Sequence, residues 1–377
     1  MYRNNLLAIV LFLVAIGLMM VFSASILQGG RMQADSTFSR QLLWVSLAFL
    51  GLWLCSKIDY HRVIRQAPLI LGVSVILLVI VLLPHVGQKI NNARRWIRFF
   101  GIGIQPSELA KLAAVIFVSW WVTRNRYWVK DLKKVFLPLM VVAVVLGGLV
   151  VMEPDFGTGV LIAAVVVFMG VLGGMRVGPL IPAAAVAMPV LYFLVWSSPY
   201  RRMRWLAFLD PWLYYKDGAG FQLIQSLIAI GSGGATGLGL GESRQKLGFL
   251  PEAINDFIFS ILGEELGFMG SVLVIGLFIA FVWNGMRAAR RARDLEGFML
   301  ISGVTMVIGF QALINLFVVT GMMPTKGISL PFISAGGSSL FFFMCSVGLM
   351  LNAVGQCREE EAGLLEDSTM PAATDEL

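Results

Sequence analysis

The sequence predicts an all-α polytopic membrane protein with ten transmembrane helices. Apolar residues make up 58% of the 377 residues and charged residues only 14%, and most charges lie between long uncharged stretches. Soluble globular domains carry roughly 25% charged residues, so this composition excludes a soluble fold, and its apolar content excludes a disordered chain. Uncharged stretches of about 20 residues can cross a bilayer as helices. The predicted spans are residues 4–30, 41–56, 66–84, 107–123, 135–152, 157–175, 177–196, 266–286, 297–320 and 340–355.

The residues at the ends of the first spans support their assignment. No small-residue cleavage site of the signal-peptide type follows residues 4–30, so we expect this span to be uncleaved. The second span, 41–56, is short and needs flanking side chains that snorkel to the interface. The fourth span starts at a Pro-Ser pair typical of a helix start, although it contains the charged residues Glu108 and Lys111.

A long external segment, residues 197–256, separates the seventh and eighth spans. Within it, residues 218–241 are uncharged but contain eight glycines. Their apolar run, 221–230, is too short to cross, so we expect a re-entrant or interfacial helix there. The last two spans are separated by residues 324–339, which are rich in Pro, Gly, Ser and Thr. Irregular backbone at this depth is expected to line a cavity, because lipid cannot satisfy its polar groups.

Basic residues predict that both chain ends are cytoplasmic. This orientation places fifteen Lys and Arg residues on the cytoplasmic side and seven on the other, once the six in residues 197–256 are set aside. Long loops are largely exempt from the positive-inside rule, which justifies that omission. We therefore predict a ten-helix domain over residues 1–356 and a disordered, acidic cytoplasmic tail over residues 357–377.

Cysteine and histidine usage excludes several kinds of site. The three cysteines lie in or beside apolar runs, so no disulfide framework is expected. His61 and His85 are the only histidines. A zinc site built on several histidines is therefore excluded, as is a Ser-His-Asp triad unless one of these two supplies the imidazole.

Charged residues on the predicted outer side are candidates for a binding site. Arg94 and Arg95 lie in an external loop against the positive-inside rule, which indicates either headgroup anchoring or an anionic ligand. Glu108 and Lys111 are three residues apart on one helix face. An ion pair inside a membrane helix is costly, so this pair is either functional or a structural pin to a neighbouring helix.

Further polar candidates lie in the long external segment and in the turns beside it. They are Arg204, Gln222, Gln225, Ser226 and Lys326. The outer cations together suit a substrate with a pyrophosphate, since Arg and Lys recognise phosphate well. The short turn with Glu153 and Asp155 is either a solvated turn or a metal or sugar contact.

Asp256 immediately precedes an apolar run at the expected membrane boundary. It either caps a helix or acts as a general base, since a low-dielectric boundary would raise the pKa of its carboxyl. Glu264 and Glu265 follow within two turns. An adjacent acid pair entering a span suggests buried hydrogen bonds.

Several long motifs, in order over residues 1–356, resemble those of the SEDS family (shape, elongation, division and sporulation proteins). They are NARRWI at 92–97, QPSELAK at 105–111, FLDPW at 208–212, GFQLIQSLIAIGSGG at 220–234, LPE at 250–252, DFIF at 256–259 and LPFISAGGSS at 330–339. Two further stretches, GLGESRQK at 239–246 and MPTKG at 323–327, are more similar to the division branch than to the elongation branch. The sporulation homologue is another close relative.

The resemblance implies a ten-span glycosyltransferase of the bacterial inner membrane, acting at the division septum. It would polymerise lipid II, the undecaprenyl-pyrophosphate-linked disaccharide-pentapeptide, into peptidoglycan. The implied partners are a class B penicillin-binding protein, other division proteins and the membrane, and no nucleic acid is implied. Asp256 matches the family's essential aspartate and is assigned as catalytic. The residues assigned to substrate binding are Arg94, Arg95, Glu108, Lys111, Arg204, Gln222, Gln225, Ser226, Glu252, Lys326 and Ser338.

In this interpretation Asp256 would deprotonate the acceptor's C4 hydroxyl, which attacks the donor's anomeric carbon and displaces lipid pyrophosphate with inversion. Cationic side chains, together with Mg²⁺ or Mn²⁺ if a divalent cation is used, would stabilise the leaving group. No metal-ligating residue is assigned. The chain departs from the family pattern at Ile254 and Asn255, where His-Thr is common, and at Ala335, where Tyr is common.

Other function classes explain part of the pattern. A lipid II flippase would also use polar spans and a cavity, but the unusual polar residues gather on one side and no inverted repeat is evident. A non-catalytic scaffold would explain the acidic tail but not the external cations. The elongation polymerase of the same family is a further alternative.

Overall fold

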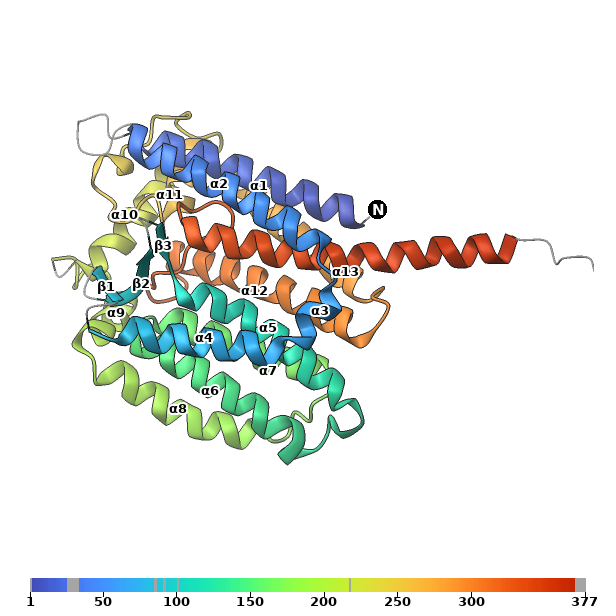
Figure 1. Ribbon diagram of the computed structural model, residues 1–377. Helices are drawn as coiled ribbons and strands as arrows, with labels where there is room; N and C mark the ends of the chain where they lie inside the picture. The colour runs from blue at the N-terminus through green and yellow to red at the C-terminus, as the bar shows by residue number, and fades with distance from the viewer. Residues whose placement is uncertain are drawn as a thin grey trace, which may run out of the picture.

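The computed structural model describes residues 2–25, 34–84, 87–90, 93–99, 102–216 and 218–369. Its α-helices are α1 (Tyr2–Ser25), α2 (Ala34–Lys57), α3 (Tyr60–Arg65), α4 (Ala67–Leu82), α5 (Pro106–Arg124), α6 (Leu137–Met152), α7 (Phe156–Leu172), α8 (Leu180–Trp196), α9 (Pro199–Leu209), α10 (Ala219–Ser232), α11 (Ile258–Ala289), α12 (Leu295–Val319) and α13 (Gly337–Thr369). The long helices lie side by side in a bundle (Figure 1). Residues 26–30 of the first predicted span and residues 370–377 of the predicted tail lie outside the described residues.

Each predicted span overlaps one helix of the bundle: α1, α2, α4, α5, α6, α7, α8, α11, α12 or α13. Six helices of the described part are long and apolar enough to cross a membrane, or seven if α8 and α9, bent by 98°, form one span. Helices α4 and α7 are apolar but shorter. The multi-pass helical architecture is therefore confirmed, whereas the number ten and the orientation stay predictions. The backbone of α13 is helical to Thr369, thirteen residues beyond the predicted end of the domain at 356.

A small antiparallel sheet interrupts the helical pattern between α4 and α5. Its strands are β1 (Gly87–Ile90), β2 (Ala93–Phe99) and β3 (Ile102–Ile104), in the order β1-β2-β3, with Ile97 opposite Ile104. The prediction of an all-α chain omitted this sheet. Its strands hold three to seven residues, too few for a strong period-two pattern, and β2 owes its extended form to closely spaced aromatic and β-branched residues.

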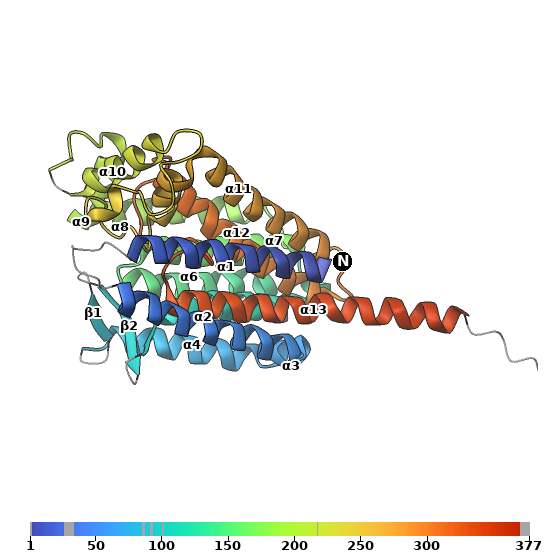
Figure 2. The same cartoon turned by 90° about the horizontal axis from the view of Figure 1, so that it is seen from above.

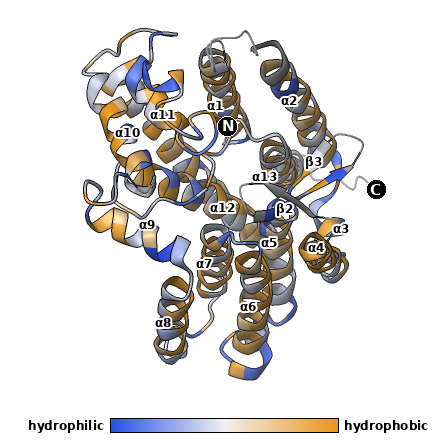
Figure 3. Cartoon of the chain, turned by 90° about the vertical axis from the view of Figure 1, so that its left-hand side faces the viewer, coloured by the Kyte–Doolittle hydropathy of each residue, from blue (hydrophilic) through white to orange (hydrophobic). Residues whose placement is uncertain are grey.

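The two ends of the bundle differ in character. The sheet, α9 and α10 gather at one end, and the N-terminus, α3 and the C-terminal part of α13 lie at the other (Figures 1 and 2). The view down the bundle shows α8 at its periphery and mostly hydrophobic helices (Figure 3). Side chains of α8 such as Ile181 and Phe193 are exposed, as expected for a surface that meets lipid.

Helix α11 is broken at Gly267, whose φ of 66° and ψ of −162° are not helical. The glycine-rich segment after α10 inserts at the break and satisfies its backbone. The N–H of Phe268 donates to the carbonyl of Gly234 at 2.9 Å, and the N–H of Leu238 donates to the carbonyl of Glu264 at 3.0 Å. The predicted span 266–286 thus corresponds to the part of α11 after the break. A short helix, α10, occupies the stretch expected to be re-entrant or interfacial.

Two buried acids hold the same glycine-rich segment. The Lys246 Nζ lies 2.9 Å from Glu265 Oε1, with both side chains almost fully buried, and Ser23 of α1 donates to Glu265 at 2.7 Å. The N–H of Arg244 donates to Glu264 Oε1 at 3.0 Å. The expectation that Glu264 and Glu265 make buried hydrogen bonds is confirmed, and these contacts join α1, α11 and residues 241–247.

We predict that Gly267→Ala destabilises the chain, whereas Gly276→Ala in the same helix does not. A Cβ at Gly267 would lie 2.2 Å from the backbone N of Gly237, and the backbone conformation itself costs a non-glycine residue about 1–3 kcal/mol. A Cβ at Gly276 meets nothing within 4 Å, so alanine should stabilise the helix there slightly. Thermal unfolding of the purified chain in detergent tests this, and a wild-type unfolding temperature for Gly267→Ala would contradict it.

Candidate active site

A cavity of about 920 Å³ lies at the sheet end of the bundle. Its walls come from β2, the start of α5, the α6–α7 turn, α9, α10, the turn before α11 and the loop between α12 and α13. Seven of the residues predicted for the site line it: Arg95, Glu108, Arg204, Gln222, Glu252, Asp256 and Lys326. Residues far apart in the sequence therefore meet around one space.

Asp256 is held in the turn before α11 by its backbone. Its carbonyl accepts a hydrogen bond of 2.7 Å from Asn315 Nδ2 of α12, which also donates to the carbonyl of Ile328 at 2.7 Å. The turn begins at Glu252, whose φ of 54° is left-handed and whose carbonyl accepts the N–H of Asn255 at 3.0 Å. These contacts direct the Asp256 side chain into the cavity wall.

The loop between α12 and α13 approaches the Asp256 carboxylate closely at Gly327. A Cβ on Gly327 would lie only 3.1 Å from Asp256 Oδ2 and 3.8 Å from Arg95 Nη1. Glycine at this position therefore lets backbone come close to the carboxylate without displacing it. Asp256, Arg95 and the loop therefore meet around Gly327 at one point of the cavity.

Burial raises the pKa of Asp256 from its ordinary value to about 7. The negative charges of Glu252 and Asp155 raise it further, whereas the positive charges of Arg204 and Arg95 lower it. A carboxyl group with this pKa exchanges its proton near neutral pH, which is the property that a general base needs.

Three cations that line the cavity, Arg201, Arg204 and Lys326, have no carboxylate partner among the described residues. Arg204 Nη1 donates to the carbonyl of Thr325 at 3.0 Å, and its guanidinium lies 4.5 Å from the centre of the Tyr200 ring. The Lys326 Nζ lies 5.2 Å from the centre of the Phe156 ring, and burial lowers the pKa of this lysine. Within the described part of the chain, neither Arg204 nor Lys326 forms a salt bridge, so both can bind an anionic ligand.

Arg95 is used differently, because it clamps the α6–α7 turn. Its Nε donates to the carbonyl of Glu153 at 3.1 Å, its Nη2 donates to the carbonyl of Pro154, and its Nη1 lies 4.0 Å from Asp155 Oδ2. The solvated-turn interpretation of this segment is wrong, since Glu153 is fully buried and Asp155 nearly so. Burial, reinforced by Asp155, raises the pKa of Glu153 to about 9, so this side chain is neutral at pH 7.

Glu108 and Lys111 form the predicted ion pair on α5, with 2.8 Å between Oε2 and Nζ. Lys111 also donates to Gln311 Oε1 at 2.6 Å, and Gln311 donates to the carbonyl of Ser329 at 2.9 Å. Glu108 faces the cavity while Lys111 faces α12. The pair thus pins α5 to α12 and to the loop, and it presents one carboxylate to the cavity.

The remaining predicted residues do not line the cavity: Arg94, Lys111, Gln225, Ser226 and Ser338. Ser226 is fully buried and joins three helices, through Ser260 Oγ at 2.7 Å and the carbonyl of Val319 at 2.7 Å. Ser338 accepts the N–H of Gln105 at 3.3 Å. Both contacts support the cavity walls, and a role for these side chains in substrate binding stays a prediction.

Sequence reasoning missed the amides of α12, Gln311 and Asn315. They lie four residues apart on one helix face, and both are buried in an otherwise apolar helix. Two amides at this spacing inside a predicted span are themselves a signal, because buried amides require partners.

A divalent cation in the cavity would meet the carboxylates of Asp155, Glu252 and Asp256. In the described parts of the chain, the one group of three potential metal ligands within 4.8 Å of one another lies elsewhere, at His61, Asp294 and Glu296. A cation such as Mg²⁺ therefore fits the cavity only if the substrate contributes ligands. Mg²⁺ is commonly held in this way, by one or two carboxylates and substrate phosphates.

Comparison with known proteins identifies relatives of the whole chain. A family model described as cell cycle protein, covering FtsW, RodA and SpoVE, matches residues 3–359. A probable peptidoglycan glycosyltransferase FtsW from Trichlorobacter lovleyi is 42% identical over 353 residues, which cover 93% of this chain and 92% of that protein. Stage V sporulation protein E from Bacillus subtilis is 38% identical over 351 residues, which cover 92% and 95%. A solved structure on the coordination of polymerization and crosslinking by a peptidoglycan synthase complex has a TM-score of 0.73 and 29% identity, covering 92% of this chain and 97% of that chain.

We predict that Asn315→Leu destabilises the chain more than Asn284→Leu. Leucine at 315 leaves the buried carbonyl of Ile328 without its donor, at a cost of about 1–3 kcal/mol, and also removes the donor of the partly buried carbonyl of Asp256. Asn284 donates only to Ala280 within its own helix, so its loss should cost little. Thermal unfolding of both variants tests this, and equal unfolding temperatures would show that Asn315 does not secure the turn.

Proposed function

Because the chain belongs to the FtsW/RodA/SpoVE family of cell cycle proteins, we propose that it is the peptidoglycan glycosyltransferase that polymerises lipid II for septal wall synthesis. The relatives named as FtsW support the activity and the division branch. The mechanism rests on Asp256, a carboxyl group with a pKa of about 7 in the wall of a large cavity. The same cavity contains cations that form no salt bridge with any described residue.

Asp256 acts as the general base in this mechanism. Its carboxylate accepts the proton of the acceptor sugar's C4 hydroxyl, and the oxygen forms a bond to the donor's anomeric carbon. The bond from that carbon to the undecaprenyl pyrophosphate breaks with inversion, and the pyrophosphate leaves with the electron pair. The pKa near neutral pH lets Asp256 take up the proton and release it again in each cycle.

Arg204 and Lys326 are the residues best suited to the leaving pyrophosphate. Their contacts with carbonyls and aromatic rings orient them without neutralising their charge. Charge-assisted hydrogen bonds to developing negative charge are worth most in a cavity that excludes water. Asp155, Glu252 and Asp256 would hold a divalent cation such as Mg²⁺ or Mn²⁺, which would supply further positive charge. Arg95 positions the turn that carries Asp155.

The family departures lie beside Asp256 and leave its chemistry intact. Ile254 and Asn255 stand where His-Thr is common in the family, and Asn255 donates to Glu252 Oε2 at 2.7 Å. The N–H of Ala335, where Tyr is common, donates to the carbonyl of Ile254 at 3.1 Å. We propose that this chain carries out proton transfer with Asp256 alone, without an imidazole or a phenol at these positions.

The membrane arrangement follows from the same proposal. Ten spans with cytoplasmic ends place the cavity on the outer side of the inner membrane, where flipped lipid II is available. A class B penicillin-binding protein would crosslink the strand as it leaves, consistent with the related synthase complex, which coordinates polymerization and crosslinking. We place the chain at the division septum with other division proteins. The flippase alternative gains no support, because the polar cavity lies at one end of the bundle.

We predict that Asp256→Asn lowers lipid II polymerisation by about 10²–10⁴-fold, the usual contribution of a general base. The amide keeps the size of the side chain but cannot accept the proton. Glu242→Gln is the matched control, because Glu242 is an exposed acid outside the cavity lining. Gel analysis of glycan strands made from labelled lipid II in the presence of the penicillin-binding protein measures the effect. Full activity of a folded Asp256→Asn chain would show that Asp256 is not the general base.

The pH profile should move in opposite directions when opposite charges beside Asp256 are removed. The base is active when ionised, so polymerisation should rise with pH through about 7. Glu252→Gln removes a charge that raises the pKa of Asp256, so the rise should shift to lower pH. Arg204→Gln removes a charge that lowers the pKa, so the rise should shift to higher pH. Profiles that coincide for the wild type and both variants would rule out Asp256 as the titrating group.

A further inference from the structure

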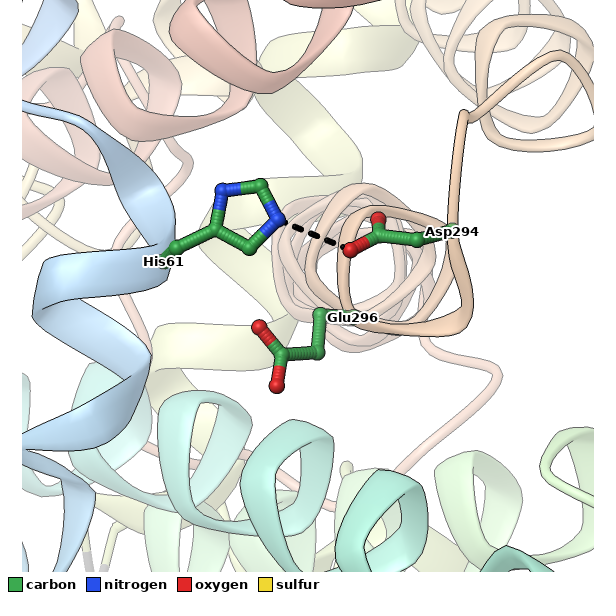
Figure 4. A group of neighbouring side chains, drawn as sticks. All are labelled: His61, Asp294 and Glu296. Carbon is green, nitrogen blue, oxygen red and sulfur yellow. Dashed lines mark hydrogen bonds and ion pairs between the residues drawn. The ribbon is translucent and has the colours of Figure 1, made fainter.

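A second group of chemically active side chains lies at the end of the bundle away from the cavity. His61 belongs to α3, Asp294 immediately precedes α12, and Glu296 lies in its first turn. One imidazole nitrogen and one oxygen of each carboxylate lie within 4.8 Å of one another. Figure 4 shows a ring nitrogen of His61 in contact with a carboxylate oxygen of Asp294, with Glu296 beside them.

The imidazole of His61 is oriented as in many metal sites. Its Nδ1 lies 3.0 Å from Asp59 Oδ1, and its Nε2 lies 2.9 Å from Asp294 Oδ2. Asp59 is itself held by Gln356 Nε2 of α13 at 3.1 Å. With the proton on Nδ1, held by the Asp59 carboxylate, the Nε2 lone pair is available to a metal ion on the side of Asp294 and Glu296.

Hydrogen bonds also orient the carboxylate of Asp294. Its Oδ1 accepts hydrogen bonds from the Tyr60 hydroxyl and from the N–H of Gly297, each at 2.8 Å. The other oxygen, Oδ2, faces His61 and makes no further hydrogen bond to a described residue. One oxygen thus anchors the carboxylate while the other remains available as a ligand.

Hydrogen bonding within the group does not explain the position of the Glu296 carboxylate. In the described part of the chain, its carboxylate has neither a hydrogen-bond donor nor an ion-pair partner, although it is half-buried. Three carboxylates, those of Asp59, Asp294 and Glu296, surround a single imidazole. The positive charges that act on Glu296 come from His61 and Arg65, and neither forms an ion pair with it among the described residues.

We propose that His61 Nε2, Asp294 Oδ2 and the Glu296 carboxylate bind a divalent first-row transition-metal ion of the Zn²⁺ type. One nitrogen and two carboxylate oxygens form a donor set that suits such an ion better than Mg²⁺ or Ca²⁺, which prefer oxygen alone. The ligands are partly exposed, so water can complete the coordination. The ion would fasten α3, which links α2 to α4, onto the start of α12. This inference is independent of the glycosyltransferase proposal.

The test uses the full chain, purified in detergent, freed of its affinity tag and stripped of metal with a chelator. Addition of Zn²⁺ should raise the unfolding temperature and saturate at one ion per chain, since binding to the folded state alone stabilises it. Co²⁺ should give a visible spectrum without the charge-transfer band of a thiolate, which separates this site from the cysteines. Absence of saturable binding, or a thiolate band, would overturn the proposal.

Variants locate the ion. Glu296→Gln keeps the shape of a ligand but removes its charge, and should weaken Zn²⁺ binding more than Asp59→Asn does. Asp59→Asn acts only through His61 and should weaken binding by about 10–100-fold. Glu242→Gln, an exposed acid elsewhere on the chain, should bind Zn²⁺ as the wild type does. If Glu296→Gln matches this control, the group is a hydrogen-bonded cluster held by a protonated His61, and no metal site exists there.

Discussion

Backbone groups at membrane depth must find partners within the protein, and the half of this chain that holds the cavity is arranged around that constraint. Helix α11 breaks at Gly267, and the glycine-rich segment after α10 supplies the missing hydrogen bonds. The loop between α12 and α13 is satisfied in the same manner. Asn315 donates to the carbonyls of Ile328 and Asp256, and Ser334 donates to the carbonyl of Asn255. The bonds that keep irregular backbone out of lipid are therefore the bonds that position the reactive carboxylate.

The same constraint decides which charges remain available to a ligand. The guanidinium of Arg95 donates hydrogen bonds to carbonyls of the α6–α7 turn, and Lys111 forms an ion pair with Glu108. Both cations therefore hold elements of the fold together. Arg204 and Lys326 contact a carbonyl or an aromatic ring, and no carboxylate of the described residues pairs with them. A buried cation whose partners are neutral loses hydration free energy, and a bound anion offsets that loss. The division between structural and functional cations thus follows from their partners and not from their position along the chain.

The sequence predicted the features that depend on composition and missed those that depend on pairing. Long apolar stretches located the long helices, including α5 despite its charged pair, and the position of Asp256 before an apolar run predicted the start of a span just after it. Nothing in the local pattern around Arg95 revealed that distant carbonyls occupy its guanidinium. The sheet was not predicted because its strands are short. The role of Asn315 was not predicted because its partners are two carbonyls 13 and 59 residues away in the chain. Such contacts exist only once the helices are packed.

Helix α12 connects the two chemically active ends of the molecule. Its amides Gln311 and Asn315 hold the cavity loop and the Asp256 turn, and its other end starts at Asp294, which faces His61 of α3. At 1.5 Å per residue, a helix of 25 residues spans roughly 37 Å, about the thickness of a bilayer with part of its interface. Tyr60 and His61 of α3 hold Asp294 at the start of this helix, and Asn315 near its end holds the Asp256 turn. The position of the reactive carboxylate therefore depends on a helix whose two ends are both fixed by polar contacts to other elements.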